Sequence, residues 1–168
     1  MWALLMRPWL RVGLVGITLL AFQTTVATQA RVAGAVVPLM LLMSAAAGVA
    51  GGVERGALVG FALGALHDLM LVSPMGLGAL AAAAAGALAG SLRARPMIPP
   101  WWLAALAVGL ASAVGEVAFP LGQALIAQEP WIGHRLWQVA LVAGLVNTVM
   151  APAAVPLARW CLRIPRPV

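Results

Sequence analysis

The sequence contains no lysine, only one cysteine and only four acidic residues among its 168 positions. A single cysteine excludes an internal disulfide and any metal site built from several cysteines. Clustered basic residues would indicate nucleic-acid binding, but the ten arginines stand singly or in pairs, so no nucleic-acid partner is expected. A soluble fold is also disfavoured, because 64% of the residues are hydrophobic against roughly 45 to 50% in globular domains.

Long apolar windows separate the few charges. Most of these windows hold about 20 residues or more, which is the length that a helix needs to cross about 30 Å of hydrocarbon. These windows, with the charged residues, prolines and glycines at their ends, predict an all-α membrane protein. They also predict a single integral membrane domain, residues 1–168. The six predicted transmembrane helices cover residues 9–28, 33–53, 56–72, 74–92, 100–119 and 136–158.

The arginines predict the orientation of these helices. With the N-terminus in the cytoplasm, eight of the ten arginines fall on the inner side and only Arg31 and Arg135 fall outside, as the positive-inside rule requires. The tryptophans support the same helix ends, because indole rings favour the membrane interface. The sequence therefore predicts an N-in, C-in protein. The alternative at the amino end is a signal peptide with the small-residue cleavage site Thr28-Gln29-Ala30, but the apolar stretch continues through Val26 and favours a retained helix.

The segment from Glu54 to residue 78 contains a regular glycine pattern. Gly56, Gly60 and Gly64 recur every four residues, so they line one helix face and let another backbone approach closely. This face is a docking surface, either for a partner or for other helices of the same chain. Such spacing is common in membrane helices and favours the second interpretation.

Pro74 follows Ser73, and this pair predicts an N-cap and a first helical position. The chain is therefore expected to turn there. The helix at residues 56–72 would cover only about 25 Å. Residues 56–92 consequently form either two complete spans or a partly re-entrant hairpin, which is tolerated where protein buries it.

Two acidic residues, Asp68 and Glu116, are expected in the outer half of their helices, where a carboxylate is costly unless paired, hydrated or hydrogen-bonded. Each is a candidate functional residue. The alternative for Asp68 is a structural partner for Arg31, His67 or free N–H groups after the turn. His67 and His134 are too few and too distant in sequence to predict a metal site, and no serine has the neighbours of a nucleophile. No catalytic residue, metal or cofactor is expected.

The remaining polar groups separate two function classes. A scaffold needs helix-packing surfaces, whereas a transporter subunit needs several convergent polar side chains around a cavity. The available groups are scattered along the chain, and the amides Gln23, Gln123 and Asn147 are expected to bond neighbouring helices. A scaffold is therefore favoured over a substrate-binding subunit, and an ion or proton pathway is the third alternative.

Residues 60–80 resemble the signature of the rod shape-determining protein MreD family, which is Gly-Phe-x-x-Gly-x-x-x-Asp, a short gap, and Pro-x-Gly-x-x-Ala-Leu. Chain length, helix number, Phe22-Gln23 and the segment at residues 147–152 are similar as well. One position departs from the family, because Pro38 is followed by Leu39 rather than by aspartate. In this chain the signature residues are Gly60, Phe61, Gly64, Asp68, Pro74, Gly76, Ala79 and Leu80.

The resemblance implies a non-enzymatic component of the bacterial cell-elongation machinery in the cytoplasmic (inner) membrane, with a role in cell shape and peptidoglycan synthesis. The implied partners are an MreC-type bitopic membrane protein and, through it, MreB-type filaments and RodA with its transpeptidase. A fold like the substrate-capture subunits of energy-coupling-factor transporters is implied too, with a vitamin-type substrate-binding subunit as the alternative function. The candidate interaction or structural residues are Gly56, Gly60, Phe61, Gly64, His67, Asp68, Pro74, Gly76 and Glu116.

Overall fold

The computed structural model describes residues 8–27, 37–70, 75–92, 100–126 and 134–163. These residues form six α-helices and no strand, which confirms the predicted all-α class and the number of helices. The first helix continues into a π-helical turn, η1 (Gln23–Ala27). The helices are α2 (Pro8–Phe22), α3 (Leu39–Gly51), α4 (Val53–Asp68), α5 (Leu77–Ser91), α6 (Trp101–Leu125) and α7 (His134–Leu162).

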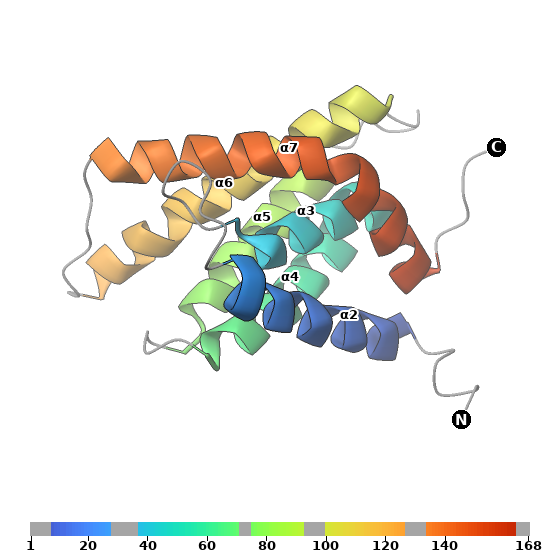
Figure 1. Ribbon diagram of the computed structural model, residues 1–168, viewed down its shortest axis with the longest axis horizontal. Helices are drawn as coiled ribbons and strands as arrows, with labels where there is room; N and C mark the ends of the chain where they lie inside the picture. Colours follow the sequence, from blue (N-terminus) through green and yellow to red (C-terminus); the bar gives the residue numbers. More distant parts are fainter. Residues whose placement is uncertain (1–7, 28–36, 71–74, 93–99, 127–133, 164–168) are drawn as a thin grey trace.

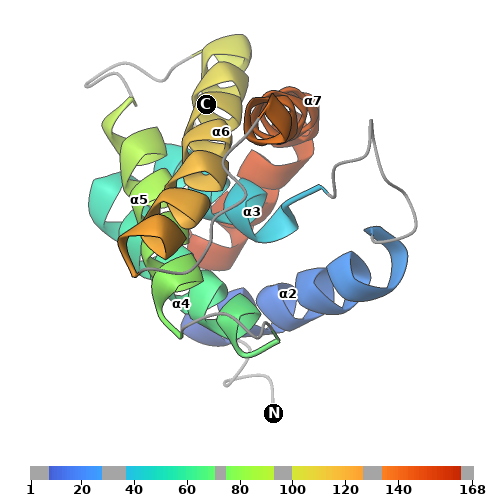
Figure 2. The same cartoon turned by 90° about the vertical axis from the view of Figure 1, so that its left-hand side faces the viewer.

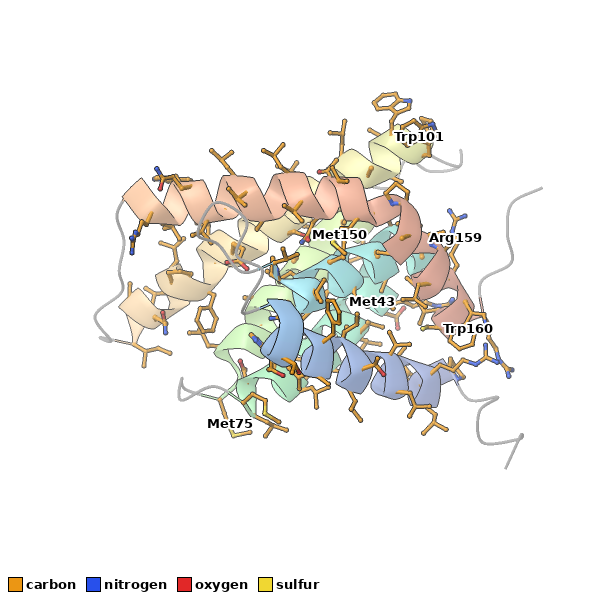
Figure 3. All side chains as sticks on the ribbon, viewed as in Figure 1. Met43, Met75, Trp101, Met150, Arg159 and Trp160 are labelled. Atoms are coloured by element: carbon orange, nitrogen blue, oxygen red, sulfur yellow. The ribbon has the colours of Figure 1, made fainter. Side chains whose placement is uncertain are left out.

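Successive helices run in opposite directions between two ends of the bundle (Figure 1). Trp101, Arg159 and Trp160 lie at one end, and Met75 lies at the other (Figure 3). We refer to these as the Trp101 end and the Met75 end. All the tryptophans whose side chains are described lie within a few residues of a helix end and are exposed, as expected of interfacial residues: Trp9, Trp101, Trp102, Trp137 and Trp160.

The core of the bundle is α3, which contacts each of the other α-helices. Nearly all of its residues are buried, and its middle consists of the small residues Ala45, Ala46, Ala47 and Gly48. A helix that is apolar all round is buried on all sides, and small side chains let neighbouring backbones approach closely in lipid. In contrast, α2 lies at one side of the bundle, away from α5 and α6 (Figure 2).

Two helices, α6 and α7, are long and apolar enough to cross a membrane, whereas α3 and α5 are shorter apolar helices. The hairpin helices α4 and α5 have 16 and 15 residues, or about 24 and about 22 Å at 1.5 Å per residue. They are therefore shorter than the predicted spans 56–72 and 74–92. Both pack against α3 and against each other, while α4 keeps one exposed face.

The predicted end of the fifth helix at residue 119 is wrong, because α6 continues through the buried Pro120 to Leu125. Proline removes one backbone N–H and bends a helix, but membrane helices continue past it where neighbouring groups compensate. The starts of the third and second predicted helices, at residues 56 and 33, also change. α4 begins at Val53, and α3 begins at Leu39 after the buried Pro38.

Candidate functional site

The hairpin helices pack with their backbones in direct contact. Gly60 of α4 faces Ala82 of α5 so closely that a Cβ atom at Gly60 would overlap the Ala82 carbonyl oxygen. Gly56 and Gly86 face each other in the same manner. Of the two interpretations of the glycine face, packing within the chain is therefore the one that the structure shows. The alternative of a partner surface on this face is wrong, because α5 occupies it.

Asp68 holds the far end of the hairpin together. It is the last residue of α4, and only 1% of its surface is exposed. Its Oδ2 atom accepts hydrogen bonds from the backbone N–H groups of Gly76 at 2.9 Å and Ala79 at 3.1 Å. The first N–H groups of a helix have no partner within the helix and attract negative charge. Asp68 thus caps α5 from the preceding helix, and the free N–H groups after the turn are its partners.

Gly76 and Gly78 make this cap possible. Gly76 is the N-cap residue of α5 with φ of 100°, a left-handed conformation that favours glycine. This conformation interrupts the helix, so α5 begins at Leu77 rather than at the predicted residue 74. A Cβ atom at Gly78 would overlap Asp68 Oδ1, which has no hydrogen-bond partner among the described residues. Pro74 lies outside the described residues.

A mostly apolar pocket that contains three polar side chains lies beside the capped hairpin. It has a volume of about 250 Å³ and is formed by η1, α3, α4, α5 and α6. Three polar side chains line it, namely Gln23, His67 and Glu116, although they are far apart in the sequence. The expectation that the polar groups are scattered is therefore wrong for these three. The rest of the lining is Pro38, Met40, Leu41, Gly64, Gly78, Ala81, Ala82, Gly115 and Phe119.

Gln23 connects three helical segments at this pocket. The Leu39 backbone N–H, the first of α3, donates to Gln23 Oε1 at 2.9 Å. Gln23 Nε2 lies 3.4 Å from His67 Nε2, to which it donates when that ring nitrogen carries no proton. The prediction that Gln23 bonds a neighbouring helix is confirmed, whereas the same prediction is wrong for Asn147, whose buried amide forms no hydrogen bond with any described residue. This residue sits in the π-helical turn, a feature frequent at functional sites.

Glu116 differs from Asp68 in its surroundings. It lies on α6 at the pocket, and its carboxylate forms no hydrogen bond or ion pair with any residue that the structure describes. An uncompensated carboxylate inside a membrane protein is costly and marks a functional candidate. The pocket thus offers the carboxylate of Glu116, the imidazole of His67 and the amide of Gln23 to a small polar ligand. Within the described ranges, no group of three or more His, Cys, Asp or Glu side chains could hold a metal ion.

The model of the rod shape-determining protein MreD family matches residues 4–160, nearly the whole chain. The chain belongs to the MreD family. This membership confirms the resemblance that residues 60–80 carry, and it assigns the chain a role in rod shape determination within a family of membrane proteins. No curated protein and no solved structure matches the chain.

Most of the MreD-type signature has a structural purpose in this chain. Gly60, Gly64, Asp68 and Gly76 build and cap the hairpin. Phe61 is different, because 51% of its surface is exposed on the side of α4 that does not face α5.

Two residues were not identified as site residues from the sequence. Gln23 was expected only to bond a helix, although the Phe22-Gln23 similarity to the MreD family pointed to its position. Gly78 occupies a variable position of the signature, and only its contact with Asp68 shows its importance.

Proposed function

We propose that the chain is a non-enzymatic membrane scaffold of the bacterial cell-elongation machinery. In this proposal it crosses the cytoplasmic (inner) membrane several times with both termini inside. It binds an MreC-type bitopic protein and, through this partner, supports peptidoglycan synthesis by RodA and its transpeptidase and connects to MreB-type filaments. Membership in the MreD family supports the role in rod shape.

The exposed face of α4 is the observation that supports partner binding most directly. The opposite face is filled by α5, and the hairpin is closed by Asp68. Leu58 and Phe61 are exposed one turn apart on the remaining face. Helices associate in lipid through side-chain packing, and a bitopic partner offers a single transmembrane helix for this purpose. An aromatic signature residue on such a face is a suitable anchor.

Recovery of the partner from membranes tests the proposal. A tagged chain carrying Phe61→Ala should bind a bitopic partner about 30-fold more weakly than the wild type and recover correspondingly less of it, because truncated aromatic anchors cost about 2 kcal/mol or more. Phe22→Ala is the matched control, since Phe22 is also 51% exposed but lies on α2. Equal recovery by both variants, or no bitopic partner with the wild type, would contradict the proposal.

A second candidate function rests on the pocket beside the hairpin and its three polar side chains. Gln23, His67 and Glu116 converge as a substrate-binding subunit requires. The family resemblance also implies a fold like the substrate-capture subunits of energy-coupling-factor transporters. The volume of about 250 Å³ is below the roughly 300 to 1,000 Å³ of typical ligand pockets, so the guest would be small. Mass spectrometry of small molecules released from the purified protein, with recovery of ABC-type ATPases, would favour this function over the scaffold.

A further inference from the structure

A second cavity lies on the other side of the molecule, between α6 and α7 at the Trp101 end. These helices meet at Gly109 and Gly144, where a Cβ atom at Gly109 would overlap the neighbouring helix. Beyond this crossing they leave a groove of about 220 Å³. Its walls are mostly small and apolar, and they include Ala105 of α6 and Val155 of α7.

Prolines explain why the groove is open. Pro152 and Pro156 lie inside α7 and border the groove. A proline in a helix interior removes a hydrogen bond and bends the helix. Figure 1 shows the last part of α7 bending away from the beginning of α6. The two helices therefore separate towards the Trp101 end, and no side chain of the described residues fills the space between them.

A single cation lies among the residues that line the groove. Arg159 is in the last turn of α7, at the same end of the molecule as Trp101 (Figure 3). It forms no hydrogen bond or ion pair with any described residue, and no described acidic side chain lines the groove. Arg11 at this end is already engaged, because it donates to the Trp160 carbonyl oxygen at 3.1 Å and lies 4.6 Å from the Trp160 ring centroid.

We propose that this groove binds one anionic phospholipid, with the phosphate on Arg159 and an acyl chain along Ala105 and Val155. A guanidinium matches phosphate oxygens in a two-pronged hydrogen bond. The proposed orientation puts the Trp101 end at the cytoplasmic leaflet, where basic pockets between helices bind anionic headgroups, and exposed Trp101 suits the interface. Free phosphate would leave the apolar walls unfilled, so a lipid is the better fit.

Native mass spectrometry of the detergent-purified chain tests this site. The probes are phosphatidylglycerol and phosphatidylethanolamine with identical acyl chains. Wild type should retain phosphatidylglycerol about fivefold more tightly, the effect expected of one arginine near an anionic headgroup. Arg159→Gln should bring the two lipids close to parity, and Arg159→Lys should keep most of the preference. Arg55→Gln, an exposed arginine at the start of α4, removes the same charge and should leave the preference unchanged.

Three results would overturn the proposal. The first is equal retention of both lipids by the wild type. The second is an equal loss of preference in Arg55→Gln and Arg159→Gln, which would indicate a diffuse charge effect. The third is displacement of phosphatidylglycerol by millimolar inorganic phosphate, which would show that the site binds phosphate and does not depend on the acyl chain. Circular dichroism of Arg159→Gln that matches the wild type would show that a lost preference does not come from unfolding.

Discussion

The carboxylate of Asp68 accepts a hydrogen bond from the Gly76 backbone N–H at 2.9 Å across the turn between α4 and α5. The same oxygen also binds the Ala79 N–H, so one side chain satisfies two groups of the first turn of α5. Burial of Asp68 excludes most water from these bonds, and a buried N–H that loses its partner is costly. The hairpin therefore depends on this carboxylate for its closed form.

Asp68→Ala should lower the free energy of unfolding by about 2 to 4 kcal/mol, because both N–H groups lose a charged acceptor in a buried place. Asp68→Asn should cost less, since one amide oxygen still accepts. Thermal unfolding in detergent measures both changes. Glu116→Gln is the control and should not lower stability, because Glu116 has no partner among the described residues to lose and the substitution removes an uncompensated charge. An unfolding temperature for Asp68→Ala equal to the wild type would show that the cap is unimportant.

Gly60→Ala should destabilise the protein by about 1 to 3 kcal/mol, the cost of forcing extra volume into a packed contact, because its Cβ atom would overlap Ala82. Gly60→Leu should prevent folding or partner recovery altogether. Gly13→Ala is the matched control. No atom lies within 4 Å of a Cβ atom there, so alanine should be neutral or stabilise helix α2 by roughly 0.5 to 1 kcal/mol. The two alanine variants should thus move the unfolding temperature in opposite directions or by clearly different amounts.

Gly78→Ala should be destabilising only while Asp68 is present, because the new methyl group would overlap Asp68 Oδ1. In an Asp68→Ala background the same substitution should cost less, with a coupling free energy of about 1 to 2 kcal/mol. The four unfolding free energies of this double-mutant cycle provide the measurement. Simple additivity within about 0.3 kcal/mol would contradict the contact.

Gln23→Leu should reduce stability by about 0.5 to 1.5 kcal/mol, because the Leu39 N–H loses the Gln23 acceptor and keeps only the Val37 carbonyl oxygen at 3.0 Å. Gln123→Leu on α6 is the matched control, since the side chain of Gln123 lies outside the pocket, and it should have a small effect. Thermal unfolding of the two variants under identical conditions measures the difference. Equal shifts in both would mean that the Gln23 contact does not contribute to stability.

The sequence by itself determined the class and number of the helices. Few charges and long apolar windows predict apolar helices long enough to cross hydrocarbon, and all six predicted helices are present. The spacing of Gly56, Gly60 and Gly64 determined that one face of α4 consists of small residues. The residues from Gly60 to Leu80 also pointed to the MreD family, as the match over residues 4–160 confirms.

Only the tertiary structure decided which surfaces meet. A membrane helix is apolar on every side, so hydropathy does not reveal which helix a given face contacts. The sequence therefore could not choose between α5 and a partner for the glycine face, nor select the N–H groups of Gly76 and Ala79 for Asp68. It likewise could not bring Gln23, His67 and Glu116 to one pocket, because their convergence depends on three-dimensional packing of segments far apart in the chain.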